Sequence, residues 1–429
     1  MPGVLLLVRI GWRNLWRNPR GTLLTALALG LGLTLLLVSL GLLDGSHEQM
    51  VDNAVRFGTG HVVVQAQGYQ ETGSQDLLLP AQALAATEAF LNTDVMKPVL
   101  RGISPRLMAS GLASSAANAA GVEIMGVVPD RERDVSLIPQ RIVEGSYLVA
   151  DQPSAVVVGT GLARKLGLKI GSRLVLMTQA VIPSNAVAMA PAGGEMASTL
   201  LRVGGIFRTG VEQVDAHIIQ VPLPAAQALL GVPDRVNQVA ILLERESDAL
   251  MVAQGLRTQL TGVPAEILPW RESMPVLARL FLLDEAFNYV MNGVVLAMVG
   301  LGILNTILMR VLERRYEFGL CLALGLRPVQ LAVMVIGESL ALTALSLALG
   351  LLLGLGLQHY FATSGLDLRW FFKSSLPAAL VFDPIIYARL SLSRIASSLG
   401  IVLLTATAIS FYPAFKAART QLPGALKGF

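Results

Sequence analysis

The residue types that most often carry out chemistry in proteins are few in this sequence and widely separated. The four histidines, His47, His61, His217 and His359, do not cluster, and none lies in an HExxH spacing. Cys321 is the only cysteine, so the sequence holds no disulfide framework. These spacings predict that the chain itself binds neither a metal ion nor another cofactor.

Motifs for nucleotide hydrolysis and acyl transfer are also missing from the sequence. No Gly-Lys dipeptide occurs, so there is no GxxxxGK[ST] phosphate loop, and no GxSxG motif is present. Carboxylates such as Glu123 do occur, and Asp130, Glu132 and Asp134 alternate with two arginines in what we interpret as a solvated loop. We therefore predict that the chain is not an enzyme and that any energy it uses comes from a partner.

The composition indicates an integral membrane protein. Hydrophobic residues make up 53% of the 429 residues and charged residues only 14%, whereas a soluble domain has nearer a quarter charged residues. The net charge of +4 is small and gives no reason to expect a nucleic-acid partner. Four long apolar runs predict transmembrane helices: Thr22–Leu43, Ala286–Met309, Val329–Leu357 and Ile395–Ala414.

Basic residues near these runs predict the orientation, because they favour the cytoplasmic side. Four arginines precede the first run, four lie between the second and third, and three basic residues follow the fourth. The loop 358–394 also carries four basic residues, against the trend. We predict four transmembrane helices with both termini on the cytoplasmic side, and a large external domain inserted between the first two.

Three regions follow from this topology. Residues 1–43 hold a cytoplasmic elbow helix and the first span, and residues 44–285 form the external domain. Residues 286–429 hold the other three spans, a short segment at 310–327, the external loop 358–394 and a cytoplasmic tail. In the elbow, Arg9, Arg13 and Arg17 recur beside Trp12 and Trp16, which suits either a helix in the membrane interface or a plain anchor.

Two features lie inside the third span. Glu338 is costly in lipid, and we expect it to bond to a neighbouring helix rather than to serve as a proton or substrate site. Gly350 and Gly354 have GxxxG spacing, which predicts a face where another helix packs closely.

We predict that the external domain is α+β with two subdomains. The first and last parts of the domain must lie together, because the chain leaves and re-enters the membrane there. Alternating or short apolar runs predict strands at 61–67, 155–158, 173–177, 201–207, 217–221, 236–243 and 265–268, and helices at 81–91, 162–166 and 248–260. A stretch at about 179–199 is almost uncharged and rich in Pro, Gly and Met. It has the composition of a hairpin that reaches for a partner, or of a plain surface loop.

Three segments resemble signatures of the FtsX/MacB-like permeases, the type VII ABC systems. They are RNLWRNPRGTLLT at Arg13–Thr25, NTILMRVLERRYEFGLCLALGLR at Asn305–Arg327 and YPAFKAARTQLPGAL at Tyr412–Leu426. Within this family the chain most resembles the lipoprotein-releasing permeases LolC and LolE, with PWRES at Pro269–Ser273 similar to their periplasmic exit.

The resemblance implies a bacterial inner membrane, with the domain at 44–285 in the periplasm, and it also implies a function and a set of partners. The chain would work with an ABC ATPase dimer that binds ATP and Mg, and with a second permease, identical or paralogous. It would extract lipoprotein cargo from membrane lipids, with acyl chains entering between the first and second spans, and pass the cargo to a periplasmic lipoprotein carrier. FtsX-like mechanotransmission to a cell-wall hydrolase and MacB-like efflux of peptides or drugs remain alternatives.

The resemblance also implies two sites. A short amphipathic helix at Arg310–Gly319 would couple the permease to the ATPase, although a charged turn that only satisfies topology is the simpler alternative. The extension at 179–199 would be a hook that docks the carrier. The coupling residues would be Glu313, Arg314, Arg315, Glu317 and Gly319, and the hook residues Pro183, Ser184, Met189 and Pro191.

Overall fold

The computed structural model describes residues 13, 16, 19–181, 196–367 and 385–418. The described chain divides into two compact units. One unit holds residues 19–48, 281–367 and 385–418, and the other holds residues 49–181 and 196–280. We call them the helical unit and the inserted unit. The elbow helix, the hook residues and the end of the cytoplasmic tail lie outside the described residues.

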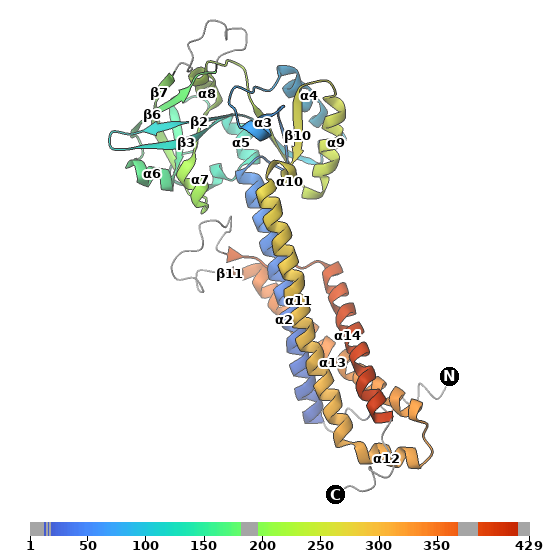
Figure 1. Ribbon diagram of the computed structural model, residues 1–429. Helices are drawn as coiled ribbons and strands as arrows, with labels where there is room; N and C mark the ends of the chain where they lie inside the picture. The colour runs from blue at the N-terminus through green and yellow to red at the C-terminus, as the bar shows by residue number, and fades with distance from the viewer. Residues whose placement is uncertain (1–12, 14–15, 17–18, 182–195, 368–384, 419–429) are drawn as a thin grey trace. The chain divides into compact units, whose positions relative to one another are not determined.

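Four helices in the described chain are long and apolar enough to cross a membrane, as the sequence predicts. They are α2 (Pro19–Phe57), α11 (Pro275–Glu313), α13 (Pro328–Ser364) and α14 (Leu392–Ala418), with the shorter α12 (Arg315–Ala323) between α11 and α13 (Figure 1). At 39 residues each, α2 and α11 are about 58 Å long, well beyond the roughly 30 Å of a bilayer core. The predicted spans therefore form only part of each helix, and the orientation remains a prediction.

Small residues allow α2 and α13 to pack closely. A Cβ atom on Gly350 would lie 2.6 Å from the Gly30 carbonyl oxygen, and one on Gly354 would lie 2.9 Å from a Leu37 methyl group. The Thr34 hydroxyl donates a hydrogen bond to the Gly350 carbonyl at 3.1 Å, so one polar contact crosses the same interface. The predicted GxxxG packing face is confirmed.

The inserted unit is built on one sheet of ten strands. Its order is β10-β1-β9-β2-β3-β8-β5-β7-β4, with β6 paired to both β2 and β7. The strands are β1 (Val62–Ala66), β2 (Leu100–Ser114), β3 (Ala119–Val127), β4 (Ile142–Gly145), β5 (Ala155–Gly159), β6 (Arg173–Gln179), β7 (Met196–Phe207), β8 (Ile218–Pro222), β9 (Gln238–Leu243) and β10 (Ala265–Pro269). The two-stranded pair β11 (Leu366–Asp367) and β12 (Ile385–Ile386) belongs to the helical unit.

Short helices cover this sheet, as expected for an α+β domain. They are α3 (Tyr69–Thr72), α4 (Ala81–Leu91), α5 (Pro129–Val135), α6 (Thr160–Leu166), α7 (Glu212–His217), α8 (Leu223–Leu230), α9 (Ala249–Gln259) and α10 (Trp270–Ser273). Two 3-10 turns lie at Ile138–Arg141 and Glu246–Asp248. Alternation along β3 separates two cores, because Val122 and Ile124 join one hydrophobic cluster whereas Met125 and Val127 join the other.

The chain enters and leaves the inserted unit at neighbouring points. Strands β1 and β10 pair antiparallel, with Val62 opposite Pro269, and the Thr59 and Ser273 hydroxyls are 3.0 Å apart. The Trp270 amide also donates a hydrogen bond to the His61 carbonyl at 2.9 Å. The first and last parts of the domain therefore lie together, as predicted.

Candidate functional site

The predicted coupling residues lie where α11 ends and α12 begins. The sequence predicted one short helix over Arg310–Gly319, and that prediction is wrong. Arg310 belongs to α11, which ends at Glu313, and Arg314 leaves helical geometry with φ −102° and ψ 17° before α12 starts at Arg315. The segment is thus a corner between two helices, and Arg314 occupies the corner.

Arg314 holds three helices together at this corner. Its Nη1 lies 2.9 Å from Oε2 of Glu338 in α13, and its Nε donates to Oε2 of Glu317 in α12 at 2.8 Å. The guanidinium also lies over the Phe318 ring, 5.2 Å from its centroid. A displacement of α12 must therefore either break these contacts or move α11 and α13 with it.

Glu338 has the neighbouring-helix partners that we expected from its sequence position. Besides Arg314, Arg310 Nη1 approaches Glu338 Oε1 at 3.8 Å, and the carboxylate side chain is only 13% exposed. A largely buried carboxylate within a membrane helix is tolerated when it is paired, because pairing offsets much of its desolvation cost. Two arginines and two glutamates make the cluster neutral, so it binds the helices to one another rather than attracting an ion.

The other coupling residues face away from this cluster or lie beneath it. Glu313 and Arg315 are exposed, and Gly319 is buried against the bundle. Along α12 runs an exposed apolar stripe with a spacing of four residues: Tyr316 is 59% exposed, Leu320 46%, and Leu324, directly after the helix, 80%. A helix that presents apolar side chains with flanking charges has the composition of a protein-docking face. The sequence motif did not reveal this stripe, although its i, i+4 spacing was visible.

Two cavities lie beside this junction, both within the helical unit. A polar one of about 500 Å³ is lined by Thr22 and Thr25 of α2, Asn305 of α11 and the Glu338 cluster. An apolar one of about 490 Å³ lies between α2 and α11 and is lined by residues such as Leu24, Leu35 and Met298. The apolar groove lies between the two helices where the resemblance implies that acyl chains enter.

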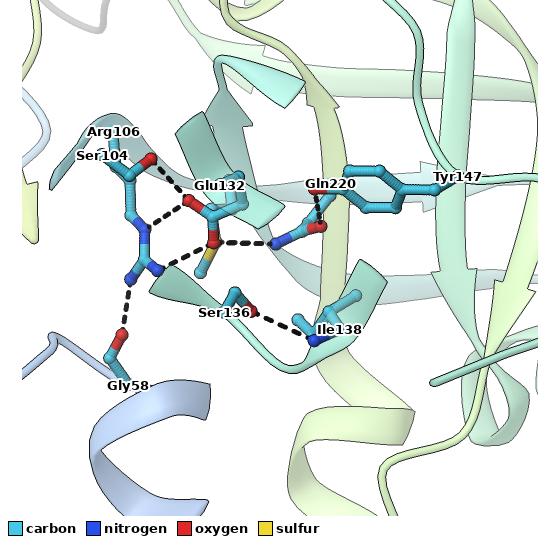
Figure 2. A network of polar contacts seen from close by, with 9 residues as sticks. Gly58, Ser104, Arg106, Glu132, Ser136, Ile138, Tyr147 and Gln220 are labelled. Carbon is cyan, nitrogen blue, oxygen red and sulfur yellow. Dashed lines mark hydrogen bonds and ion pairs between the residues drawn. The ribbon is translucent and has the colours of Figure 1, made fainter. Parts of the chain in front are cut away.

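A second polar cluster lies in the inserted unit, on the sheet face shown in Figure 2. Glu132 of α5 is fully buried and accepts hydrogen bonds from Ser104 Oγ at 2.6 Å and from Nε and Nη2 of Arg106 at 3.0 and 2.7 Å. Arg106 Nη1 donates to the carbonyl oxygen of Gly58, directly after α2. The interpretation of 130–134 as a solvated loop is therefore wrong, because this segment is helical and its central carboxylate is buried.

This second cluster fixes the end of α2 to the middle of the sheet. The Gly58 carbonyl is one of the groups that a helix leaves unpaired at its C-terminal end, and a cation is favourable there. Gln220 of β8 connects the pair to Tyr147, whose hydroxyl donates to Gln220 Oε1 at 2.9 Å. Burial is the main cause that raises the pKa of Tyr147 well above its usual value, so this hydroxyl keeps its proton as a donor.

The hook residues Pro183, Ser184, Met189 and Pro191 lie outside the described residues, so the structure says nothing of their role. Elsewhere in the described chain, no group of three or more His, Cys, Asp or Glu side chains is placed to hold a metal ion.

Two family models match the sequence. A model described as MacB-like periplasmic core domain matches residues 22–259, and one described as FtsX-like permease C-terminal matches residues 289–422. Together they cover both the helical and the inserted unit.

The names of similar curated proteins carry two different roles, lipoprotein release and macrolide export. The chain is 21% identical to the lipoprotein-releasing system transmembrane protein LolC of Neisseria meningitidis, over 72% of this chain and 69% of LolC. It is 22% identical to the corresponding LolE of Haemophilus influenzae, over 76% of each chain. It is also 22% identical to the macrolide export ATP-binding/permease protein MacB of Agrobacterium fabrum, over 85% of this chain but 54% of MacB.

Among solved structures, the periplasmic region of MacB from Actinobacillus actinomycetemcomitans aligns with 52% of this chain and 95% of its own length. The sequence identity is 9% and the TM-score is 0.35.

Proposed function

We propose that this chain, which belongs to the ABC transporter permeases with a MacB-like periplasmic core and an FtsX-like C-terminal domain, releases lipoproteins from the inner membrane. In this proposal a separate ATPase dimer supplies the energy, and the inserted unit passes the cargo to a periplasmic carrier. The similarity to LolC and LolE over most of their lengths favours this role.

The observation that carries the coupling step is the Arg314 corner. An ATPase that docks on the apolar stripe of α12 would change shape when it binds and hydrolyses ATP. Because Arg314 bonds to both Glu317 and Glu338, that motion would reach α13 through an ion pair and α11 through the backbone. Rigid-body displacement of packed helices is a common way to carry such a change through a protein.

The apolar groove between α2 and α11 supports the choice of cargo. Its volume of about 490 Å³ lies within the usual range for ligand pockets, and its walls are mainly apolar. Each methylene group moved from an apolar environment into water costs about 0.8 kcal/mol, so an acyl chain needs such a surface when it leaves the bilayer. Closing this groove with energy from the ATPase would then expel the acyl chain toward the carrier.

A second permease, identical or paralogous, completes the proposal. On α11, the side chains at Leu283, Phe287, Val290, Val294 and Leu301 are all exposed and follow one another at intervals of four, three, four and seven residues. This heptad-like spacing suits pairing with another helix. The hook at 179–199 remains our prediction for the contact with the carrier.

Reconstitution with the ATPase tests the coupling step. Tyr316→Asp places a charge in the exposed stripe of α12, and we expect it to abolish both co-purification of the ATPase and release of lipoprotein. Tyr360→Asp is the matched control, because Tyr360 is similarly exposed (58%) but lies near the C-terminal end of α13, whereas α12 precedes the N-terminal end of α13. Normal ATPase binding and cargo release by Tyr316→Asp would refute the docking face.

Export of macrolides or peptides is the second candidate, supported by the match to MacB over 85% of this chain. Co-purification from native membranes distinguishes the two. A bound triacylated lipoprotein supports lipoprotein release, whereas ATPase activity stimulated by a macrolide, with no bound lipoprotein, supports export. A bound peptidoglycan hydrolase would instead indicate FtsX-like mechanotransmission.

A further inference from the structure

The inserted unit holds a cavity of about 410 Å³ that neither the coupling site nor the groove between α2 and α11 includes. It lies on the sheet face that carries Arg106, beside the end of α2 and α3. Its volume falls within the range of small-molecule sites, and its walls are about equally polar and apolar.

Most of the polar groups around this cavity already have partners. The charge of Arg106 is balanced by Glu132, and its remaining nitrogen bonds to the Gly58 carbonyl. Gln70 donates to the Ser273 carbonyl at 2.9 Å, and Gln238 donates to a buried glutamine of β1 at 3.4 Å. These groups shape the cavity, but they have little capacity left to hold a ligand.

Of the charged groups that line this cavity in the described chain, Glu123 is the one without such a partner. Its register places it between Ser110 of β2 and Ile218 of β8, on the cavity face of the sheet. Within the described residues, no hydrogen bond or ion pair reaches its carboxylate. The side chain is exposed to the cavity, and desolvation by the surrounding protein raises its pKa, while His217 acts in the opposite direction.

Tyr69 faces the same space. Burial, together with the nearby charge of Glu123, raises the pKa of Tyr69 to about 12, so its ring carries a neutral hydroxyl at physiological pH. Phe57, Met108 and Met125 line other parts of the wall. With Arg106 neutralised, the cavity therefore offers one unpaired negative charge, an aromatic ring and an apolar surface.

We propose that this cavity binds a small organic ammonium ion with an apolar body. The cationic head would lie against the Glu123 carboxylate and the Tyr69 ring, since carboxylates and aromatic rings both attract ammonium groups. The apolar body would contact Phe57 and the two methionines, which adapt readily to different shapes. An anion is disfavoured because Arg106 is already paired, and a single carboxylate offers too few ligands for a divalent metal.

The test uses the full-length protein in lipid nanodiscs and benzyltrimethylammonium as the probe, with binding measured by isothermal titration calorimetry. Glu123→Gln keeps the shape of the side chain but removes its charge, and we expect it to weaken binding at least tenfold. Tyr69→Leu should weaken binding several-fold. Glu144→Gln, an exposed carboxylate on β4, should leave the affinity unchanged.

Benzyl alcohol serves as the neutral probe, and we expect it to bind wild type at least tenfold more weakly than the cation and to be insensitive to Glu123→Gln. Thermal unfolding midpoints verify that each variant is folded. The proposal is overturned if wild type fails to bind the cation at millimolar concentration, or if Glu123→Gln binds it as tightly as wild type.

Discussion

The buried pair of Arg106 and Glu132 makes a quantitative prediction about the stability of the inserted unit. Glu132→Gln preserves the size of the side chain but removes the charge that balances Arg106, whose side chain is 2% exposed. Leaving one partner of a buried ion pair uncompensated costs about 3–5 kcal/mol. The free energy of opening this part of the sheet should fall by that amount.

Hydrogen–deuterium exchange of the full-length protein in nanodiscs measures this change where it occurs. When exchange is limited by the opening equilibrium, a loss of about 3–5 kcal/mol accelerates it roughly a hundredfold to several thousandfold. The effect should concentrate in peptides from β2 and α5, and in the last turn of α2, because Arg106 bonds to the Gly58 carbonyl.

A surface pair in the same unit provides the matched control. Arg131 and Glu88 also form an ion pair, but their side chains are 46% and 32% exposed. Glu88→Gln should therefore change the free energy of opening, as measured by hydrogen exchange, by less than about 1 kcal/mol. Similar exchange rates in Glu132→Gln and Glu88→Gln would refute the reasoning, because burial would then make no difference to the pair.

Three further predictions concern other parts of the chain. Gly350→Leu must displace α2, so it should lower the thermal midpoint by several degrees. Gly356→Leu should not lower it, because no atom lies within 4 Å of a Cβ placed on Gly356. Equal effects of the two substitutions would exclude the packing face. Burial lowers the pKa of His61, whose Nδ1 accepts a hydrogen bond from the Leu243 amide at 3.1 Å. The unfolded chain therefore binds a proton at this histidine more readily than the folded chain does. The thermal midpoint should fall as the pH drops below about 6.5 and should level off below the pKa of His61 in the folded chain. His61→Gln should flatten that pH dependence, and an unchanged slope would assign it to another group. Glu338→Gln should leave ATPase binding intact but reduce lipoprotein release, since it removes the ion pair that joins the corner to α13; full release would contradict the coupling route.

The parts of the fold that local composition determines could be predicted from the sequence. Apolar runs long enough to cross a bilayer core, uncharged apart from Glu338, indicate the four membrane helices, and α4 forms at Ala81–Leu91, where the apolar spacing predicts it. The GxxxG face of α13 and the pairing of Glu338 also follow from residue type, because lipid leaves a carboxylate few alternatives.

Features that depend on distant partners could not be predicted in this way. Strand β2 reads LRGISPRLMASGLAS, and its glycines, proline and arginine hide the alternation that marks a strand. Glu132 lies among charged neighbours, so the sequence suggests a solvated loop, and only the fold brings Arg106 of β2 to it. The corner at Arg314 was missed for a similar reason, because ion pairs to Glu317 and Glu338 stabilise it and the helix-forming sequence gives no stop signal there.

The pairing of β1 with β10, and of Thr59 with Ser273, has a consequence for how such proteins diversify. Everything between these two points forms a closed module whose ends meet, so its contents can be exchanged without altering the spacing of the two helices that it interrupts. A chimaera that grafts another domain between Thr59 and Ser273 should therefore preserve the helical unit. One helical unit would then be compatible with inserted units of different sequence and binding preference.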